Sequence, residues 1–229
     1  MEAYALDISL KHRVALGESD PYSEIIQEYE AAIIHRQGES ETVAGTFDFY
    51  VANVGLAVNS GVDIVDVVDS LEEDIYQYCN ALFEPGTRSE VREDVVEQFE
   101  YPMGNRVLML HLAKVLPEHR SRRLGLVAAQ KIIQQFGDGL VVAKAQPLQH
   151  HSGFNEEKEM SYGTFEQQRD VALKRLTRHW QRLGFKPIGD TGYLGLNTAY
   201  KLPVPRLVIT KRVSKRPAKA PPKPARRRT

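Results

Sequence analysis

The clearest signal of the fold is RVLMLHLAKVLPEHRSRRLGLVAAQKIIQQF, residues 106–136. The stretch opens with an almost unbroken apolar run, which is typical of a strand that is buried on both faces. Apolar residues then recur every four positions, which predicts a helix; these residues are Leu124, Ala128, Ile132 and Phe136. The sequence therefore predicts a strand, a short loop and a helix, a typical unit of a layered α/β structure.

Three arginines occupy the loop between this strand and this helix: Arg120, Arg122 and Arg123. A helix that begins near Arg123 leaves backbone N–H groups unpaired at its N-terminus, where the helix dipole also favours negative charge. Phosphate groups bind at such helix ends, and arginine side chains add charge-assisted hydrogen bonds. Gly125 would allow either close approach of a ligand to the backbone or close packing of the helix on the strand. The loop therefore predicts a pyrophosphate site, unless its arginines are ordinary solvated surface charge.

Strand patterns and helix patterns alternate along the rest of the chain. The expected strands cover 4–16, 42–58 (one strand or a hairpin), 140–146, 185–189 and 193–202, and the expected helices cover 19–38, 63–83, 89–99 and 165–184. This alternation predicts an α/β structure with a mainly parallel or mixed sheet.

Two of the expected helices depend on particular residues. The helix at 19–38 has Asp20 as its N-cap, Pro21 in its first turn and Gly38 as its stop signal. The helix at 165–184 has one apolar face with spacings of three and four residues, formed by Leu173, Leu176, Trp180 and Leu183. We expect Trp180 to pack in the core.

The zero net charge of the 229 residues conceals a division of charge along the chain. Residues 206–229 hold ten of the thirty Lys and Arg residues and none of the thirty Asp and Glu residues, so residues 1–205 carry a net charge of about −10. We expect one folded domain over 1–205 and an extended, proline-rich tail over 206–229. The tail could contact nucleic acid phosphates or an anionic membrane surface, fold back on the acidic body, or only aid solubility.

Cysteine content and apolar patterning bear on location. Cys79 is the only cysteine, which excludes an internal disulfide and suits a reducing cytoplasm. The first residues, MEAYALDISLKHR, do not read as a secretory signal peptide. The longest apolar runs have the length of strands, so no membrane span is expected.

The stretch LAKVLPEHRSRRLGLVAAQKII, residues 112–133, resembles the acetyl-coenzyme A binding segment of the GNAT N-acetyltransferases. In that family a strand and a proline precede the loop motif Gln/Arg-x-x-Gly-x-Gly/Ala, which opens a helix. When the two are aligned by Pro117, Arg120 matches the first motif position and Gly125 the last. Arg123 stands where the family has its first glycine.

A second stretch, HWQRLGFKPIG at 179–189, is similar to the late helix and strand of the same family. The two resemblances together cover about residues 106–202. They imply an α+β fold of three layers, in which a mixed central sheet splays between its parallel strands and helices cover both faces. They also imply acetyl-coenzyme A as the co-substrate.

The resemblance assigns a role to each residue of the loop. Backbone groups of Lys114 and Val115 would pair with the pantetheine arm, and Arg120 would begin the loop. The pyrophosphate would lie on the backbone N–H groups of Ser121, Arg122, Arg123, Leu124 and Gly125. The acyl group would pass directly from the thioester to an amine, with no covalent enzyme intermediate.

The catalytic groups depart from the family pattern. The family often uses a tyrosine as general acid at the position of Trp180, and tryptophan cannot donate an acidic proton. Tyr193 and Tyr200 lie in the following strands, where tyrosine is more often a packing residue. His111 interrupts the apolar strand before the loop, so it is either the base that deprotonates the amine or an ordinary buried histidine.

These observations predict a cytoplasmic N-acetyltransferase that acts on an amine. The acidic body of the protein would attract a cationic amine, so a cationic acceptor is expected. The alternative is a catalytically silent GNAT-like binding module, tethered to nucleic acid or to a protein by its basic tail. No metal is expected, because the adjacent His150 and His151 lack further ligands at suitable spacing.

Overall fold

The computed structural model describes residues 2–11, 23–69, 73–84, 86–87, 89–102, 104–145 and 162–208. The expectations for the tail beyond residue 208 fall outside these residues, and His150 and His151 also lie outside them.

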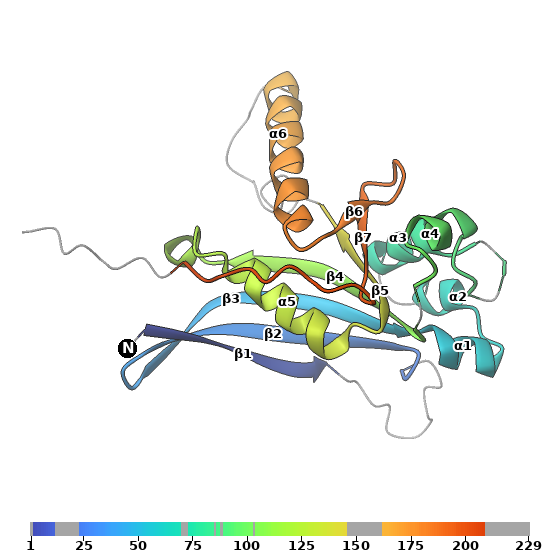
Figure 1. Ribbon diagram of the computed structural model, residues 1–229, viewed down its shortest axis with the longest axis horizontal. Helices are drawn as coiled ribbons and strands as arrows, with labels where there is room; N and C mark the ends of the chain where they lie inside the picture. The colour runs from blue at the N-terminus through green and yellow to red at the C-terminus, as the bar shows by residue number, and fades with distance from the viewer. Residues whose placement is uncertain are drawn as a thin grey trace, which may run out of the picture.

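A seven-stranded sheet in the order β1-β2-β3-β4-β5-β7-β6 forms the centre of the molecule (Figure 1). Its strands are β1 Glu2–Lys11, β2 Ile26–Gln37, β3 Ser40–Asn53, β4 Arg106–Val115, β5 Gly139–Lys144, β6 Lys186–Pro187 and β7 Tyr193–Asn197. Among the described strands, β4 and β5 are parallel and all other neighbours are antiparallel. A mixed sheet was one of the two expectations, and it is confirmed.

The helices lie between particular strands. Between β3 and β4 come α1 Val54–Ser60, α2 Ile64–Asp69, α3 Glu73–Leu82 and α4 Glu93–Gln98; a 3-10 turn at Pro117–His119 and α5 Leu124–Phe136 follow β4, and α6 Tyr162–Gln181 follows β5. The strand, loop and helix expected at 106–136 are thereby confirmed.

Both faces of the sheet are covered by helices, because neighbouring residues of the central strands point to opposite sides. On β4, Val107 and Met109 pack with α2, α3 and α4 in one core. Leu108 and Leu110 pack with α5 and the end of α6 in a second core on the other side. The expectation of an α+β structure with helices on both faces is confirmed in this form.

The helix expected at 19–38 is wrong, because most of this segment is β2. This strand pairs with β1 on one side and with β3 on the other. Its residues alternate between faces: Glu28 forms an ion pair with Lys11 of β1 at 3.0 Å, whereas Ala31 and Ile33 are buried in the core under α5. Pairing along both edges outweighs the local helix signals.

Three other boundaries differ from expectation. The strand expected at 42–58 ends at Asn53, whose side-chain Oδ1 accepts a hydrogen bond from the Leu56 N–H at 3.1 Å and caps α1. The single helix expected at 63–83 is two helices, α2 and α3. The helix expected at 89–99 is the shorter α4.

Helix α6 projects from the body, and only its C-terminal part joins the core (Figure 1). Trp180 and Leu183 are buried, as expected, with exposed fractions of 6% and 0%. Leu173, which was expected on the same buried face, is exposed because it lies on the projecting part. In the part of the chain that the structure describes, no helix combines the length and the apolar character needed to cross a membrane.

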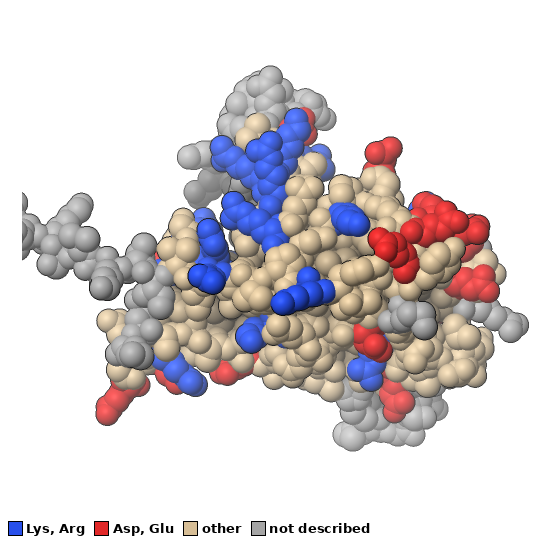
Figure 2. All heavy atoms as spheres, viewed as in Figure 1, with Lys and Arg blue, Asp and Glu red and all other residues tan. Residues whose placement is uncertain are grey.

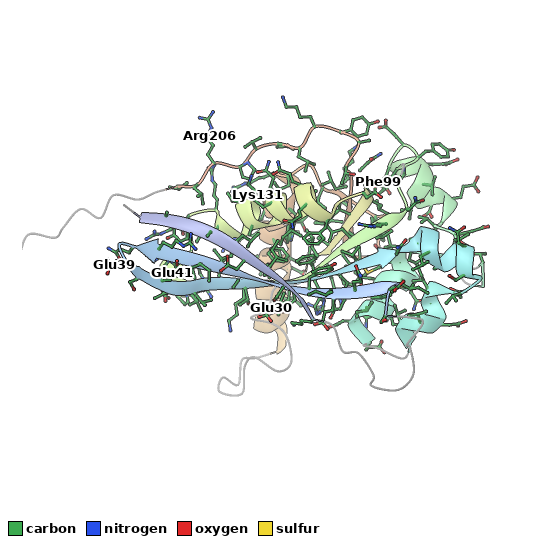
Figure 3. The ribbon with its side chains drawn as sticks, turned by 90° about the horizontal axis from the view of Figure 1, so that it is seen from below. Glu30, Glu39, Glu41, Phe99, Lys131 and Arg206 are labelled. Atoms are coloured by element: carbon green, nitrogen blue, oxygen red, sulfur yellow. The ribbon has the colours of Figure 1, made fainter. Side chains whose placement is uncertain are left out.

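The segment after β7, residues 201–208, runs alongside α5 towards the arginine loop (Figures 1 and 3). The side-chain amide of Gln130 on α5 donates to the carbonyl of Pro203 at 3.1 Å. The backbone N–H of Val208 donates to the carbonyl of Arg122 at 3.2 Å. Arg206 points away from this segment into solvent, so the tail starts beside the loop.

Candidate functional site

The parallel strands β4 and β5 diverge in the middle of the sheet. They pair from Arg106 and Gly139 as far as Leu110 and Ala143, and β4 then continues to Val115 alongside β3 alone. Among the described residues, the backbone edge of β4 beyond Leu110 therefore has no strand partner on the β5 side. An opening of this kind is where an extended ligand could pair with the backbone.

His111 is the extra residue of a β-bulge at this divergence. Leu110 pairs with Phe49 and Leu112 pairs with Asp48, so His111 has no partner of its own on β3. Its half-buried ring lies 5.6 Å from the ring of Tyr50. Bulges redirect side chains and are common beside active sites, so the position of His111 suits a base.

A buried tyrosine that the sequence did not single out bridges the two strands where they part. The hydroxyl of Tyr78 on α3 donates to the carbonyl of Leu110 at 2.8 Å and accepts from the backbone N–H of Lys144 at 3.1 Å. The side chain is 1% exposed. Burial, together with the nearby Tyr193, raises the pKa of Tyr78 far above its usual value, so the hydroxyl stays protonated.

Aromatic and charged side chains surround this hydroxyl. The ring of Tyr193 lies 4.8 Å from that of Tyr78, and its buried hydroxyl has no hydrogen-bond partner among the described residues. The ammonium group of Lys144 lies 5.8 Å from the Tyr193 ring centre and 3.6 Å from a carboxylate oxygen of Asp74. The divergence therefore combines two phenols, an imidazole, an amine and a carboxylate. Tyr200, in contrast, is exposed and hydrogen-bonded to Glu100.

The two buried tyrosines make the free energy of unfolding decrease at alkaline pH. Burial raises the pKa of both Tyr78 and Tyr193 above the value near 10 of an unfolded tyrosine. Their contribution to the free energy of unfolding is thus complete below pH 10 and is lost as the pH rises further, by up to about 1.4 kcal/mol per pH unit for each. We expect urea unfolding between pH 9 and 11.5 to show this decline, and Tyr78→Phe to make it shallower. Equal slopes for both proteins would contradict this assignment.

The loop after β4 has an unusual backbone conformation. Ser121 and Arg123 adopt φ values of +64° and +62°, in the left-handed region, and Arg123 is the residue before α5 begins. A residue with a side chain is strained there by roughly 1 kcal/mol or more, whereas glycine is not. This conformation gives a physical reason for the glycine that the GNAT motif has at the position of Arg123.

The three loop arginines point in different directions. Arg120 donates from Nε to the carbonyl of Val115 at 3.0 Å and so closes the end of β4. Arg122 donates to the hydroxyl of Tyr4 on β1, which also contacts Nδ1 of His119 at 3.2 Å. The exposed Arg123 makes no ion pair or hydrogen bond within the described ranges. Two of the three arginines therefore anchor the loop, and one is available to a ligand.

The other residues implied by the resemblance lie along the same edge. Lys114 and Ser121 are exposed, Val115 is half-buried, and Leu124 is buried and can offer only its backbone. A Cβ atom at Gly125 would meet only Cγ2 of Val115, at 3.8 Å. The fold itself therefore does not require glycine at this position, and space above the helix start remains for a ligand.

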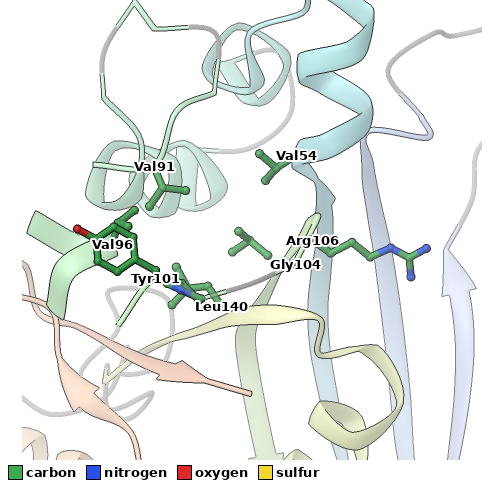
Figure 4. Close-up of a pocket in the computed structure, with 9 residues that line it drawn as sticks. Val54, Val91, Val96, Tyr101, Gly104, Arg106 and Leu140 are labelled. Carbon is green, nitrogen blue, oxygen red and sulfur yellow. The ribbon is translucent and has the colours of Figure 1, made fainter. Parts of the chain in front are cut away.

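Two surface pockets lie elsewhere. One, of about 260 Å³, lies beside the start of β4 and is lined mainly by apolar side chains, among them Val54 of α1, Leu140 of β5 and Tyr101 after α4 (Figure 4). The other, of about 300 Å³, lies between the end of α4 and β7. Neither is lined by residues of the loop or of the divergence. In the described part of the chain no group of three or more His, Cys, Asp and Glu side chains could hold a metal ion.

Comparison with known proteins identifies no relative: no protein-family model, no curated protein and no solved structure matches the chain.

Proposed function

We propose that the chain is an N-acyltransferase of the GNAT type, with acetyl-coenzyme A as the acyl donor. One observation carries the proposal: the strand that loses its partner, β4, is the strand that leads directly into the arginine loop and the start of α5. A ligand with a linear arm and a pyrophosphate would meet both features in sequence. Its arm would lie along Lys114 and Val115, and its pyrophosphate on the N–H groups from Ser121 to Gly125.

The reaction would be a direct transfer at the divergence of the two strands. The lone pair of the acceptor amine attacks the thioester carbon, a C–N bond forms and the C–S bond breaks. A base must take one proton from the amine, and an acid must protonate the departing thiolate. His111 on the bulge is the proposed base. The departing thiolate would take its proton from water, because burial raises the pKa of Tyr78 and its hydroxyl already donates to the Leu110 carbonyl, which makes Tyr78 a poor acid.

The acceptor is proposed to be a cationic amine. Residues 1–205 carry an excess of acidic residues, which would raise the local concentration of a cation. Asp74 lies on α3 beside the divergence, where its carboxylate forms an ion pair with Lys144. The same carboxylate could bind a cationic substrate at this place.

A second candidate is a binding module without catalysis, tethered to nucleic acid or to a protein partner by its basic tail. It is favoured by Trp180, which occupies the position of the family's tyrosine. Its indole Nε1 is buried with no hydrogen-bond partner among the described residues. This candidate keeps the ligand site and loses the chemistry.

Calorimetric titration of acetyl-coenzyme A, combined with a graded series at one position, tests the ligand site that both candidates share. We expect Gly125→Ala to bind nearly as the parent does, because the motif accepts alanine there. Gly125→Val should lower the affinity at least tenfold, because its methyl groups would cover the N–H groups at the helix start. Lys131→Ala, farther along α5, is the control and should leave the affinity unchanged.

Three outcomes separate the hypotheses. Binding together with release of free thiol in the presence of an amine supports the transferase. Binding without thiol release over a panel of cationic amines supports the silent module. If acetyl-coenzyme A does not bind to the parent protein at millimolar concentration, both are wrong.

A further inference from the structure

Positive side chains lie along the C-terminal half of helix α6 and just past its end. Lys174 and Arg178 are four residues apart on α6, Arg175 lies beside them, and Arg182 follows Gln181, the last residue of the helix. Four residues advance a helix by about 6 Å, so Lys174 and Arg178 stand on the same side of α6, one turn apart. All four are exposed. We call these four residues the α6 basic row.

No carboxylate within the described residues neutralises the α6 basic row. None of the four side chains makes an ion pair or a hydrogen bond there, and Asp170 is the only acidic residue between 169 and 182. Several cations elsewhere in the chain are paired, for example Arg36 with Glu41 at 2.6 Å. Four neighbouring cations that have no ion-pair partner among the described residues repel one another.

Charge is divided between two sides of the molecule. Figure 2 shows Lys and Arg side chains gathered over α6 and acidic side chains gathered over α3 and α4. The acidic residues of the second region are Asp63, Asp66, Glu73, Asp74, Glu84, Glu90, Glu93, Asp94, Glu97 and Glu100. A large anion would therefore be attracted to the α6 side and repelled from the α3 and α4 side, which fixes its orientation.

We propose that the α6 basic row is a docking surface for double-stranded nucleic acid, which it binds through the phosphates. A duplex carries one phosphate per about 3.4 Å of axis on each strand, so the row can meet several phosphates at once. No aromatic side chain is exposed between 169 and 182, because Trp180 is buried, so stacking on single-stranded bases is not favoured. Binding through phosphates alone is independent of sequence.

A membrane surface suits this helix less well. An interfacial helix buries a broad apolar face with large side chains. Between residues 169 and 182, the exposed large apolar side chains are only Val171 and Leu173. The proposal is also independent of acyl transfer, since it uses none of the residues of the divergence or of the arginine loop.

The test is the salt dependence of binding to a fluorescent 20-base-pair duplex of arbitrary sequence, measured by anisotropy with the full chain. The variant is Lys174→Gln, Arg178→Gln and Arg182→Gln together, and the matched control is Arg36→Gln, Arg92→Gln and Arg106→Gln, which lie outside α6.

Three lost phosphate contacts should lower the slope of log K against log salt by about 2.7. At 0.1 M salt we expect an affinity loss of about a hundredfold or more for the variant. The control should change little, and both should keep the thermal midpoint of the parent.

Several results would overturn the proposal. The proposal is wrong if the parent does not bind the duplex at all, or if the variant and the control lose equal affinity, which would mean that only total charge matters. It is also wrong if removal of residues 209–229 abolishes binding while the variant binds as the parent does, which would place the contact in the tail. Tighter binding to anionic lipid vesicles than to the duplex would favour the membrane. As a positive check, Arg175→Lys, Arg178→Lys and Arg182→Lys together should retain the slope, because phosphate contacts need only the charge.

Discussion

Gly195→Ala should lower the free energy of unfolding by about 3 kcal/mol. A Cβ atom built on Gly195 of β7 would lie 2.4 Å from the nearest ring atom of Phe99 and within 2.9 Å of two others. The Phe99 ring is 4% exposed and follows α4, so it cannot swing into solvent. The side-chain amide of Asn197 also holds the Phe99 carbonyl at 2.7 Å, which fixes the backbone at this contact. Overpacking of this kind is among the costly core changes.

Urea denaturation of Gly195→Ala measures this effect, and Gly125→Ala is the matched control. At Gly125 the added methyl group lies at ordinary van der Waals distance from the Val115 side chain. Alanine also stabilises a helix by roughly 0.5–1 kcal/mol relative to glycine. Phe99→Leu should partly rescue Gly195→Ala, so that the double variant is more stable than the sum of the two changes predicts. An unchanged unfolding midpoint for Gly195→Ala would show that the ring can move.

Tyr78→Phe should lower the free energy of unfolding by about 2 kcal/mol. Phenylalanine keeps the ring packing but leaves the Leu110 carbonyl and the Lys144 N–H without the hydroxyl that bridges them.

Tyr76→Phe is the control for Tyr78→Phe, because it removes a hydroxyl from the same helix at a half-buried position. Urea denaturation of both variants at neutral pH measures the effect. Equal unfolding midpoints for Tyr78→Phe and Tyr76→Phe would show that the two hydrogen bonds of Tyr78 add no stability.

The sequence allowed the centre of the fold to be predicted because local and tertiary signals agree there. At residues 106–136 a continuous apolar run matches a strand buried on both faces, and a four-residue spacing matches a helix on one face. Neither signal needs knowledge of distant residues. The position of the arginine loop followed from these two elements alone.

The sequence misled at 19–38 for a physical reason. Asp20, Pro21 and Gly38 are local helix signals, but β2 gains hydrogen bonds and burial from partners on both sides. The alternation of polar and apolar residues around Glu28 and Ala31 was a signal for a strand. It could be recognised only once the ion pair of Glu28 with Lys11 and the burial of Ala31 under α5 were known. Long-range pairing of this kind is not encoded locally.

The candidate site was predicted only in part. The loop residues follow from a motif, whereas Tyr78 joins the site because α3 packs across the point where two distant strands part. In the sequence it was one of several apolar-face residues of a helix. Its phenol among aliphatic neighbours was the only signal, since a buried hydroxyl needs a partner. The anchoring of Arg120 and Arg122 likewise depends on contacts with Val115 and Tyr4.

The strand order also determines the order in which the sheet can assemble. The strands β1, β2 and β3 are neighbours in sequence and in space, so each pair closes a short connection. The pairing of β5 with β7 joins Ala143 to Leu194 and must close roughly fifty residues before it gains any hydrogen bond. We expect the first three strands to form early during synthesis and β7 to join last. Until β7 emerges, β5 presents an open edge, the part of the nascent chain most exposed to mispairing.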